Sequence, residues 1–229
     1  MSFSIQEFWD RGFCKCTENI PTSRVLQLYT LLQAHGDPDR GHDKHGNYYN
    51  RAPSQHVEWA NWWSQDASVF AAVNDVVKFY MPQISLLLDD PVLYHTDFVV
   101  TTPHFREVKP HIDTPYRFES FENEQRLLGV QCLLPLTMFD SSTGSTAFVP
   151  GSHREQWDIK KCYRGEYNEY FSEHCEQTTL GGGEMVIWHP RVLHSAMPNN
   201  SPSKRCALLM LFVESDVHDE IRVIDNIFT

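Results

Sequence analysis

The chain lacks the features that mark membrane-spanning and nucleic-acid-binding proteins. Its longest wholly apolar run, residues 207–213, is far shorter than the roughly 20 residues that a spanning helix needs. Lysine and arginine number 19 against 30 acidic residues, which gives a formal net charge of −11. Such a charge disfavours binding to phosphate-rich polymers and to anionic lipid surfaces. We therefore expect neither a nucleic-acid partner nor a membrane partner.

Signals for secretion and for a disulfide framework are also missing. The opening stretch MSFSIQEFWD is polar and carries acidic residues where a signal peptide has its apolar core. The six cysteines have no regular spacing, and Cys132 and Cys206 lie in apolar strand patterns, where a reduced thiol packs as a small hydrophobic group. Cys14 and Cys16 are not followed by a second pair with zinc-finger spacing. These features predict a cytoplasmic protein with reduced thiols.

Length and composition suit one large folded domain. The 229 residues are 41% hydrophobic and 13% aromatic, which is enough to fill a substantial core. We predict a single domain over residues 1–229, with a helical N-terminal part over about 1–90 and a barrel core over about 91–215.

Helical patterns are confined to the N-terminal part. Ser4 and Glu7 are spaced as a capping box and Gly12 is a helix stop, so residues 4–12 predict a short helix. Two amphipathic helices are expected over residues 21–36 and 66–82, the second ended by a proline. Three aromatic side chains in or next to the first helix are expected in the core: Phe8, Trp9 and Phe13.

Residues 35–63 are rich in glycine, aspartate, histidine and aromatic residues and show no period. A loop of this length inside a compact domain is usually functional or mobile, so we expect a lid or a wall that faces the substrate. Its His42, His45 and His56 are expected to be solvated rather than to bind a metal.

From residue 91 onward, short β-like runs alternate with turn residues. Many short strands of this kind argue for a sandwich or a barrel. Residues 155–177 have no clear period and are expected as an insertion over one barrel end. The runs that predict strands are 93–102, 107–112, 127–136, 145–149, 184–188, 192–195 and 206–213.

Three His-x-Asp triplets are the first candidates for a metal site, although each alone is a weak signal. The triplet at 35–37 resembles a turn that ends a helix. In the triplet at 95–97, both side chains share one face of a predicted strand and can pair with each other. The triplet at 111–113 stands at the end of a strand, just before a Thr-Pro pair, so its side chains emerge where the strand stops.

His111, Asp113 and His194 together have the composition of a 2-His-1-carboxylate metal site. Two neighbouring ligands and a third from a distant strand, 194 − 111 = 83 positions on, leave open places on an octahedral metal. This arrangement suits Fe(II) with a bidentate cosubstrate and O2. Arg205, 205 − 194 = 11 positions further, offers a planar cation for the far carboxylate of a dicarboxylate cosubstrate.

These segments resemble the phytanoyl-CoA dioxygenase-like branch of the Fe(II)/2-oxoglutarate oxygenases. The resemblance covers the opening FWDRGF, HIDTP, the TGSTAFVPGSH turn, and GGGEMVIWHPRVLHS with the arginine beyond it. It implies a mainly β fold with flanking helices, the double-stranded β-helix, a jelly-roll or cupin-like barrel. It also implies that His111, Asp113 and His194 bind Fe(II) and that Arg205 binds the 5-carboxylate of 2-oxoglutarate.

Further residues take their expected roles from the same resemblance. Gln131 lies on a strand that faces the site in relatives, so it is a candidate cofactor-binding residue; a polar side chain bonded to neighbouring backbone is the alternative. His153 is expected to be structural. Relatives often carry a hydroxyl residue where this chain has Ala196, which leaves the partner of Arg205 open. Relatives also often have Gly-Asp where residues 183–184 are Gly-Glu, a change expected to be tolerated.

The expected function is a non-haem Fe(II)- and 2-oxoglutarate-dependent dioxygenase that hydroxylates a small-molecule metabolite. Asp113 favours hydroxylation, because the related halogenases have a small residue at this place. A non-catalytic metal- or ligand-binding β-helix domain, acting as a sensor or scaffold, is the alternative. A cupin-like metal isomerase is a third possibility, which leaves Arg205 without a role. Four aromatic residues are candidates either for a substrate pocket or for the core: Tyr116, Phe118, Trp157 and Trp188.

Overall fold

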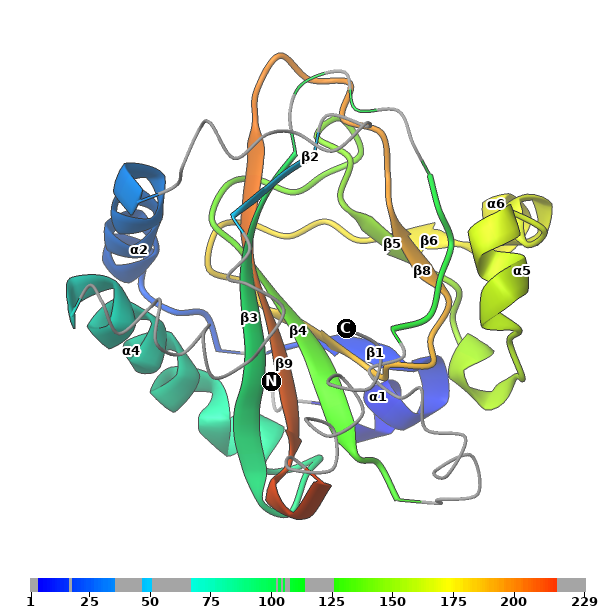
Figure 1. The fold of residues 1–229 in the computed structure, drawn as a ribbon, viewed down its shortest axis with the longest axis horizontal. Coiled ribbons are helices and arrows are strands. Elements are labelled where there is room, and N and C mark those ends of the chain that lie inside the picture. Colours follow the sequence, from blue (N-terminus) through cyan, green and yellow to red (C-terminus); the bar gives the residue numbers. More distant parts are fainter. Residues whose placement is uncertain are drawn as a thin grey trace.

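The computed structural model describes residues 4–16, 18–35, 47–50, 67–101, 103, 105, 108–113 and 126–217. Two antiparallel sheets lie face to face, and helices cover their outer sides (Figure 1). The larger sheet has the order β1-β7-β4-β9-β3-β2 and the smaller one β6-β5-β8. Among the described strands, only β2 with β3 and β5 with β6 pair as neighbours in the sequence. The other pairings bring distant parts of the chain together.

The strands that build the larger sheet are β1 (Phe13–Lys15), β2 (Asn47–Asn50), β3 (Pro91–Thr101), β4 (Gly129–Pro135), β7 (Val186–Trp188) and β9 (Arg205–Glu214). The smaller sheet consists of β5 (Thr146–Phe148), β6 (Glu176–Gln177) and β8 (His194–Ala196). The predicted strand at 107–112 is reduced to a single bridge between His111 and His194. The other six predicted strands are confirmed within two residues or so of their ends. The edge strands β1, β2 and β6 were not predicted, because runs this short carry no period.

The first helix, α1 (Ile5–Arg11), begins and ends as its sequence predicts. The Ser4 hydroxyl accepts the Glu7 N–H at 3.0 Å, and Gly12 adopts a left-handed φ of 83° that stops the helix. Phe8 and Phe13 are buried, but Trp9 is 41% exposed, so its prediction as a core residue was wrong. Adjacent residues of a helix point about 100° apart, and only Phe8 faces inward.

The helix α4 (Ala67–Ile84) continues through Pro82, contrary to the prediction that this proline ends it. Proline removes one N–H from the helical ladder and does not force the chain to leave the helix. Gln83 and Ile84 are buried after it, and the Ser85 N–H donates to the Met81 carbonyl at 2.9 Å. Packing against the sheet therefore outweighs the proline. The expected cap at residue 66 lies outside the described residues.

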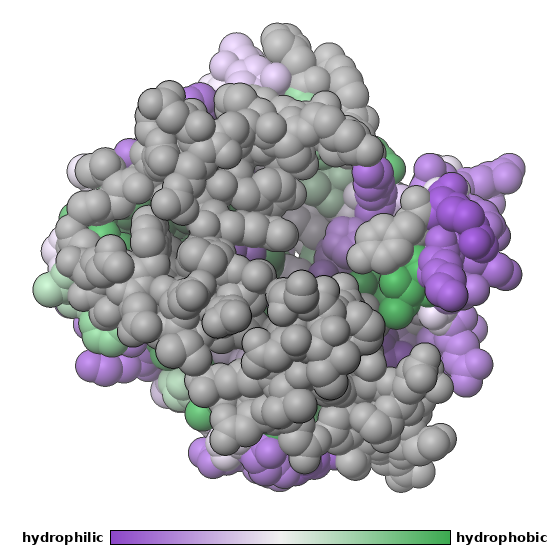
Figure 2. Space-filling model, in the orientation of Figure 1, coloured by the Kyte–Doolittle hydropathy of each residue, from purple (hydrophilic) through white to green (hydrophobic). Residues whose placement is uncertain are grey.

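The remaining helices frame the two sheets. The helix α2 (Thr22–His35) lies beside α4 on the outer face of the larger sheet (Figure 1). The insertion at 155–177 folds as α5 (Ile159–Arg164) and α6 (Asn168–His174), beside the smaller sheet. Their outer side forms a hydrophilic flank of the molecule (Figure 2). No helix of the described residues has the length and apolarity that crossing a membrane requires.

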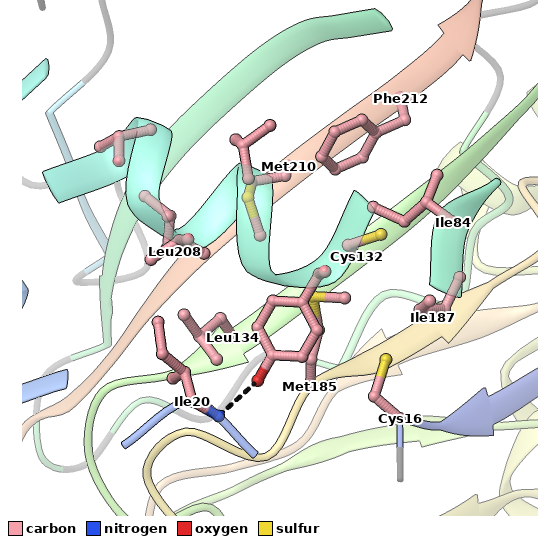
Figure 3. Packing of buried hydrophobic residues seen from close by; sticks show 14 of the residues in the cluster. Cys16, Ile20, Ile84, Cys132, Leu134, Met185, Ile187, Leu208, Met210 and Phe212 are labelled. Atoms are coloured by element: carbon pink, nitrogen blue, oxygen red, sulfur yellow. Dashed lines mark hydrogen bonds between the residues drawn. The ribbon is translucent and has the colours of Figure 1, made fainter. Parts of the chain in front are cut away.

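The largest hydrophobic cluster fills the space between α2, α4 and the outer face of the larger sheet (Figure 3). Cys16 and Cys132 pack there with Met185 and Met210 as free thiols, and burial raises the pKa of Cys14 to about 12. The thiols are thus protonated apolar fillers. A second cluster, which includes Phe148 and Trp188, lies between the two sheets.

Tyr80 ties this core to two loops. Its hydroxyl accepts the Ile20 N–H at 3.2 Å and donates to the Gly183 carbonyl at 2.7 Å, and the ring is fully buried. Tyr80→Phe leaves both backbone groups without that partner, so we expect about 2 kcal/mol less free energy of unfolding, measured by urea titration. Tyr170→Phe, at an exposed tyrosine, is the matched control and is expected to change it by less than about 0.5 kcal/mol. Equal free energies of unfolding for the two variants would contradict the stabilising role of the Tyr80 hydroxyl.

Candidate active site

Three side chains predicted as metal ligands come together between the two sheets. One ligand atom each from His111, Asp113 and His194 lies within 4.8 Å of the others, and no other such group of three occurs among the described residues. The segment 108–113 is held beside β8 by a reciprocal backbone pair. The His111 N–H donates to the His194 carbonyl at 2.9 Å, and the His194 N–H to the His111 carbonyl at 3.0 Å. This pair brings residues 83 positions apart into one site.

Both histidines direct Nε2 toward the shared space. Nδ1 of His111 lies 2.7 Å from the Lys109 carbonyl, and Nδ1 of His194 lies 3.0 Å from the Val192 carbonyl. A carbonyl only accepts, so Nδ1 carries the proton and Nε2 keeps its lone pair. Burial lowers the pKa of His194 to about 4, so this imidazole is neutral at pH 7. A neutral imidazole is the form that binds a metal.

Asp113 faces both imidazoles. Its Oδ1 lies 3.6 Å from His111 Nε2 and its Oδ2 lies 3.2 Å from His194 Nε2. Burial opposes ionisation of Asp113, but the two histidines and the N–H of Trp188 outweigh burial and lower the pKa of the carboxyl. Burial opposes protonation of His111, but the nearby Asp113 carboxylate outweighs burial and raises the pKa of this imidazole. A metal at the site therefore takes the place of a proton between His111 and Asp113. Two imidazole nitrogens and one carboxylate are donors that suit a divalent metal such as Fe(II).

Arg205 lies at the start of β9, inside the barrel, and is 4% exposed. The register places it opposite Thr101 of β3, and its Nη2 donates to the Thr101 hydroxyl at 2.8 Å. The guanidinium carbon also lies 4.9 Å from the centre of the Phe139 ring. Thr101 is therefore a partner of Arg205, which the sequence alone did not identify. Ser195, beside Ala196, is engaged elsewhere, since its hydroxyl accepts the Lys109 N–H at 3.0 Å.

Gln131 lies in β4, directly opposite Trp188 of β7 and Leu211 of β9. Opposed residues of a sheet share a face, so Gln131 points to the same side as Trp188. Its side chain is 9% exposed, and its Oε1 has no hydrogen-bond partner among the described residues. The role of Gln131 as a cofactor-binding residue stays a prediction.

The sequence model of the family described as Phytanoyl-CoA dioxygenase (PhyH) matches residues 22–207. The chain belongs to the PhyH family. It is a non-haem Fe(II)- and 2-oxoglutarate-dependent oxygenase, with Fe(II), 2-oxoglutarate and O2 as cofactor and cosubstrates. The resemblance noted from the sequence is confirmed, and no curated protein matches the chain.

Solved structures share the fold of this PhyH protein at low sequence identity. EvdO2 from Micromonospora carbonacea var. aurantiaca is 19% identical with a TM-score of 0.63, over 91% of this chain and 89% of EvdO2. SnoK, a non-haem α-ketoglutarate-dependent carbocyclase from nogalamycin biosynthesis, is 15% identical with a TM-score of 0.63, over 93% and 83%. HygX from Streptomyces hygroscopicus, solved with nickel and 2-oxoglutarate, is 15% identical with a TM-score of 0.61, over 93% and 87%. The two facing sheets are the double-stranded β-helix, which confirms the predicted fold class.

Trp188 of this PhyH protein contributes to the site in a way that the sequence did not reveal. It is 2% exposed in the cluster between the sheets, and its Nε1–H donates to Asp113 Oδ2 at 2.8 Å. Trp157, by contrast, donates to the Ser152 carbonyl at 2.7 Å and packs against Tyr167 near α5. Of the four aromatic residues considered for a pocket, Tyr116 and Phe118 lie outside the described residues.

Other candidates of the PhyH chain lie away from the three ligands. The Nε2 of His153 lies 3.2 Å from the Trp9 carbonyl, in a structural turn. Asp97 is buried in β3, opposite Leu209, and takes no part in the metal-ligand group. Glu184 accepts the Gly181 N–H at 2.6 Å and so closes the glycine turn at residues 181–184. The three histidines of the loop at 35–63 lie outside the described residues.

Proposed function

We propose that this PhyH protein hydroxylates a small-molecule metabolite and that His111, Asp113 and His194 are its Fe(II) ligands. The convergence of one donor atom from each within 4.8 Å supports this proposal most strongly. When bound, Fe(II) supplies the redox chemistry by which O2 and 2-oxoglutarate oxidise a C–H bond. The protein side chains hold the metal, orient the cosubstrate and exclude water. Asp113 as the third ligand favours hydroxylation over halogenation.

The chain offers a separate place for each end of 2-oxoglutarate. Arg205 binds the 5-carboxylate, because it is a permanently charged planar fork inside the barrel and already bonds to the Thr101 hydroxyl. Gln131 is the second cosubstrate or substrate contact, since its buried Oε1 has no partner among the described residues. The same proposal takes residues 1–229 as one domain, because one core cluster joins α2 and α4 to the strands of the larger sheet.

A small organic substrate fits what the structural neighbours bind. HygX was solved with hygromycin B together with nickel and 2-oxoglutarate. The net charge of −11 disfavours a highly phosphorylated substrate. A metabolite extract incubated with enzyme, Fe(II), 2-oxoglutarate and O2 should yield a product one oxygen atom heavier, detected by mass spectrometry.

Succinate release tests the proposal against a non-catalytic binding domain. The wild-type protein should release succinate from 2-oxoglutarate with Fe(II) and O2, above the level of a His111→Ala control. Anaerobic addition of Fe(II) and 2-oxoglutarate to metal-free protein should produce a visible charge-transfer absorbance. Tight metal binding without succinate release would favour the sensor or scaffold instead, and turnover without 2-oxoglutarate would favour an isomerase.

Thr101→Val is expected to raise the KM for 2-oxoglutarate about fivefold to tenfold. The substitution keeps the side-chain shape but removes the hydroxyl that orients Arg205, and one hydrogen bond contributes about 1 kcal/mol. Steady-state succinate formation at varied 2-oxoglutarate measures the change. Thr178→Val removes a hydroxyl that donates to the Thr146 carbonyl, at a site without contact to Arg205, and should leave KM unchanged. The same KM in both variants would exclude this role of Thr101.

A further inference from the structure

The three proposed metal ligands are oriented in two different ways. Each histidine is fixed from its own segment, by a backbone carbonyl two residues earlier that accepts from Nδ1. Among the described residues, Asp113 has no such hydrogen bond within its own segment. The bond that orients it comes from the indole of Trp188 on β7, 188 − 113 = 75 positions away. We infer that Trp188 is a positioning residue that sets the orientation of the Asp113 carboxylate for metal binding, an inference that rests on the proposed metal site.

The hydrogen bond from Trp188 to Asp113 can orient the carboxylate both with and without a bound metal. The distance from Nε1 to Oδ2 is 2.8 Å, in the range of a strong hydrogen bond, and the acceptor is a carboxylate oxygen. An indole N–H only donates and does not titrate in the physiological range. The contact therefore persists whether or not the neighbouring imidazoles bind a metal. The indole therefore restricts rotation of the Asp113 carboxylate, which would hold the metal together with the two imidazoles.

Packing keeps the indole in place. Trp188 is 2% exposed and lies in a central strand, opposite Phe13 on one side and Gln131 on the other. Its ring centre lies 5.5 Å from that of Phe148 and 5.3 Å from that of His194. The same side chain thus bonds to one proposed ligand and packs against a second. A donor fixed in this way orients the carboxylate without a cost in side-chain entropy at the moment of metal binding.

A bulky core residue at position 188 could equally serve packing alone, and Trp188→Phe separates the two roles. Phenylalanine retains an aromatic ring in the cluster between the sheets and removes only the N–H donor and part of the ring. Trp157→Phe is the matched control. This substitution removes a comparable hydrogen bond, from the Trp157 N–H to the Ser152 carbonyl at 2.7 Å. That bond involves none of the three proposed ligands.

The test is a titration of metal-free protein with Co(II) in the absence of O2, followed by calorimetry and by the visible spectrum of the bound ion. Trp188→Phe should weaken Co(II) binding about 10–100-fold and change the visible bands, because loss of a supporting hydrogen bond to a ligand has effects of this size. Trp157→Phe should bind within about twofold of wild type. Wild-type affinity and spectrum in folded Trp188→Phe protein would overturn the inference. Failure of the wild-type protein itself to bind Co(II) would instead overturn the proposed metal site.

A second measurement needs no variant at position 188, should that variant fail to fold. The wild-type protein with ¹⁵N-labelled tryptophan has six indole signals. Addition of Zn(II) should shift one of them strongly, and that signal should be among the slowest to exchange with solvent and should remain present in Trp157→Phe. A Zn(II) complex in which no slowly exchanging indole signal moves would overturn the inference.

Discussion

His194→Ala is expected to abolish metal-dependent succinate formation, with a loss greater than about 100-fold. The substitution removes a buried donor atom that lies 3.2 Å from Asp113 Oδ2 and leaves two ligands where three converge. A loss beyond that caused by removing a supporting partner is expected, because a direct ligand disappears. Succinate measured at saturating 2-oxoglutarate and Fe(II) reports the change.

The control for this variant is His174→Ala. His174 lies exposed at the end of α6, where its ring stacks on Tyr170, and removing it should leave succinate formation within about twofold of wild type. The backbone bridge between positions 111 and 194 does not depend on the imidazole, so metal-free His194→Ala should fold. Retained turnover in folded His194→Ala protein would refute the assignment of this ligand.

Arg205→Met is expected to raise the KM for 2-oxoglutarate by about 30-fold or more. Removing one partner of a buried charged pair has a cost of roughly 2–5 kcal/mol, part of which reflects the other charge left without its partner. Methionine keeps an unbranched apolar side chain but eliminates the charged guanidinium that lies over the Phe139 ring. Arg205→Lys should fall between wild type and Arg205→Met, because it keeps the charge and loses the planar fork.

Steady-state kinetics with 2-oxoglutarate as the varied substrate measure this effect. Arg164→Ala serves as the control, because it removes an exposed arginine that pairs only locally with Glu166 and should not alter KM. If the KM of folded Arg205→Met equals that of wild type, the cosubstrate carboxylate is bound elsewhere.

Much of this architecture could be predicted from local patterns. The apolar runs of β4 and β9 and the capping box of α1 each mark their element, since burial or a specific hydrogen bond requires those residue types. The pair at 111 and 113 stood out because a strand pattern ends beside it. His194 followed from the donor set that such a metal needs, and Arg205 from the need of a dicarboxylate cosubstrate for a cation at its far end.

The rest depends on register between strands that are distant in the sequence. Thr101 meets Arg205 only because β3 and β9 pair with a shift between Leu93 and His95. Trp188 reaches Asp113 only because the segment 108–113 crosses toward β7. The continuation of α4 past Pro82 likewise reflects packing on the sheet, which no local signal near the proline reports.

The reciprocal backbone bridge between His111 and His194 links metal affinity to local unfolding. It is reinforced by the Ser195 hydroxyl on the Lys109 N–H, so the segment 108–113 detaches from β8 only if the two histidines separate. A metal bound by both imidazoles links the segment 108–113 to β8. It therefore favours, by mass action, the state in which the two are paired. At a metal concentration about 100 times the Kd, this linkage adds about 2.7 kcal/mol to the free energy of opening. A bound metal ion therefore stabilises the contact between the segment 108–113 and β8, in addition to its role as a cofactor.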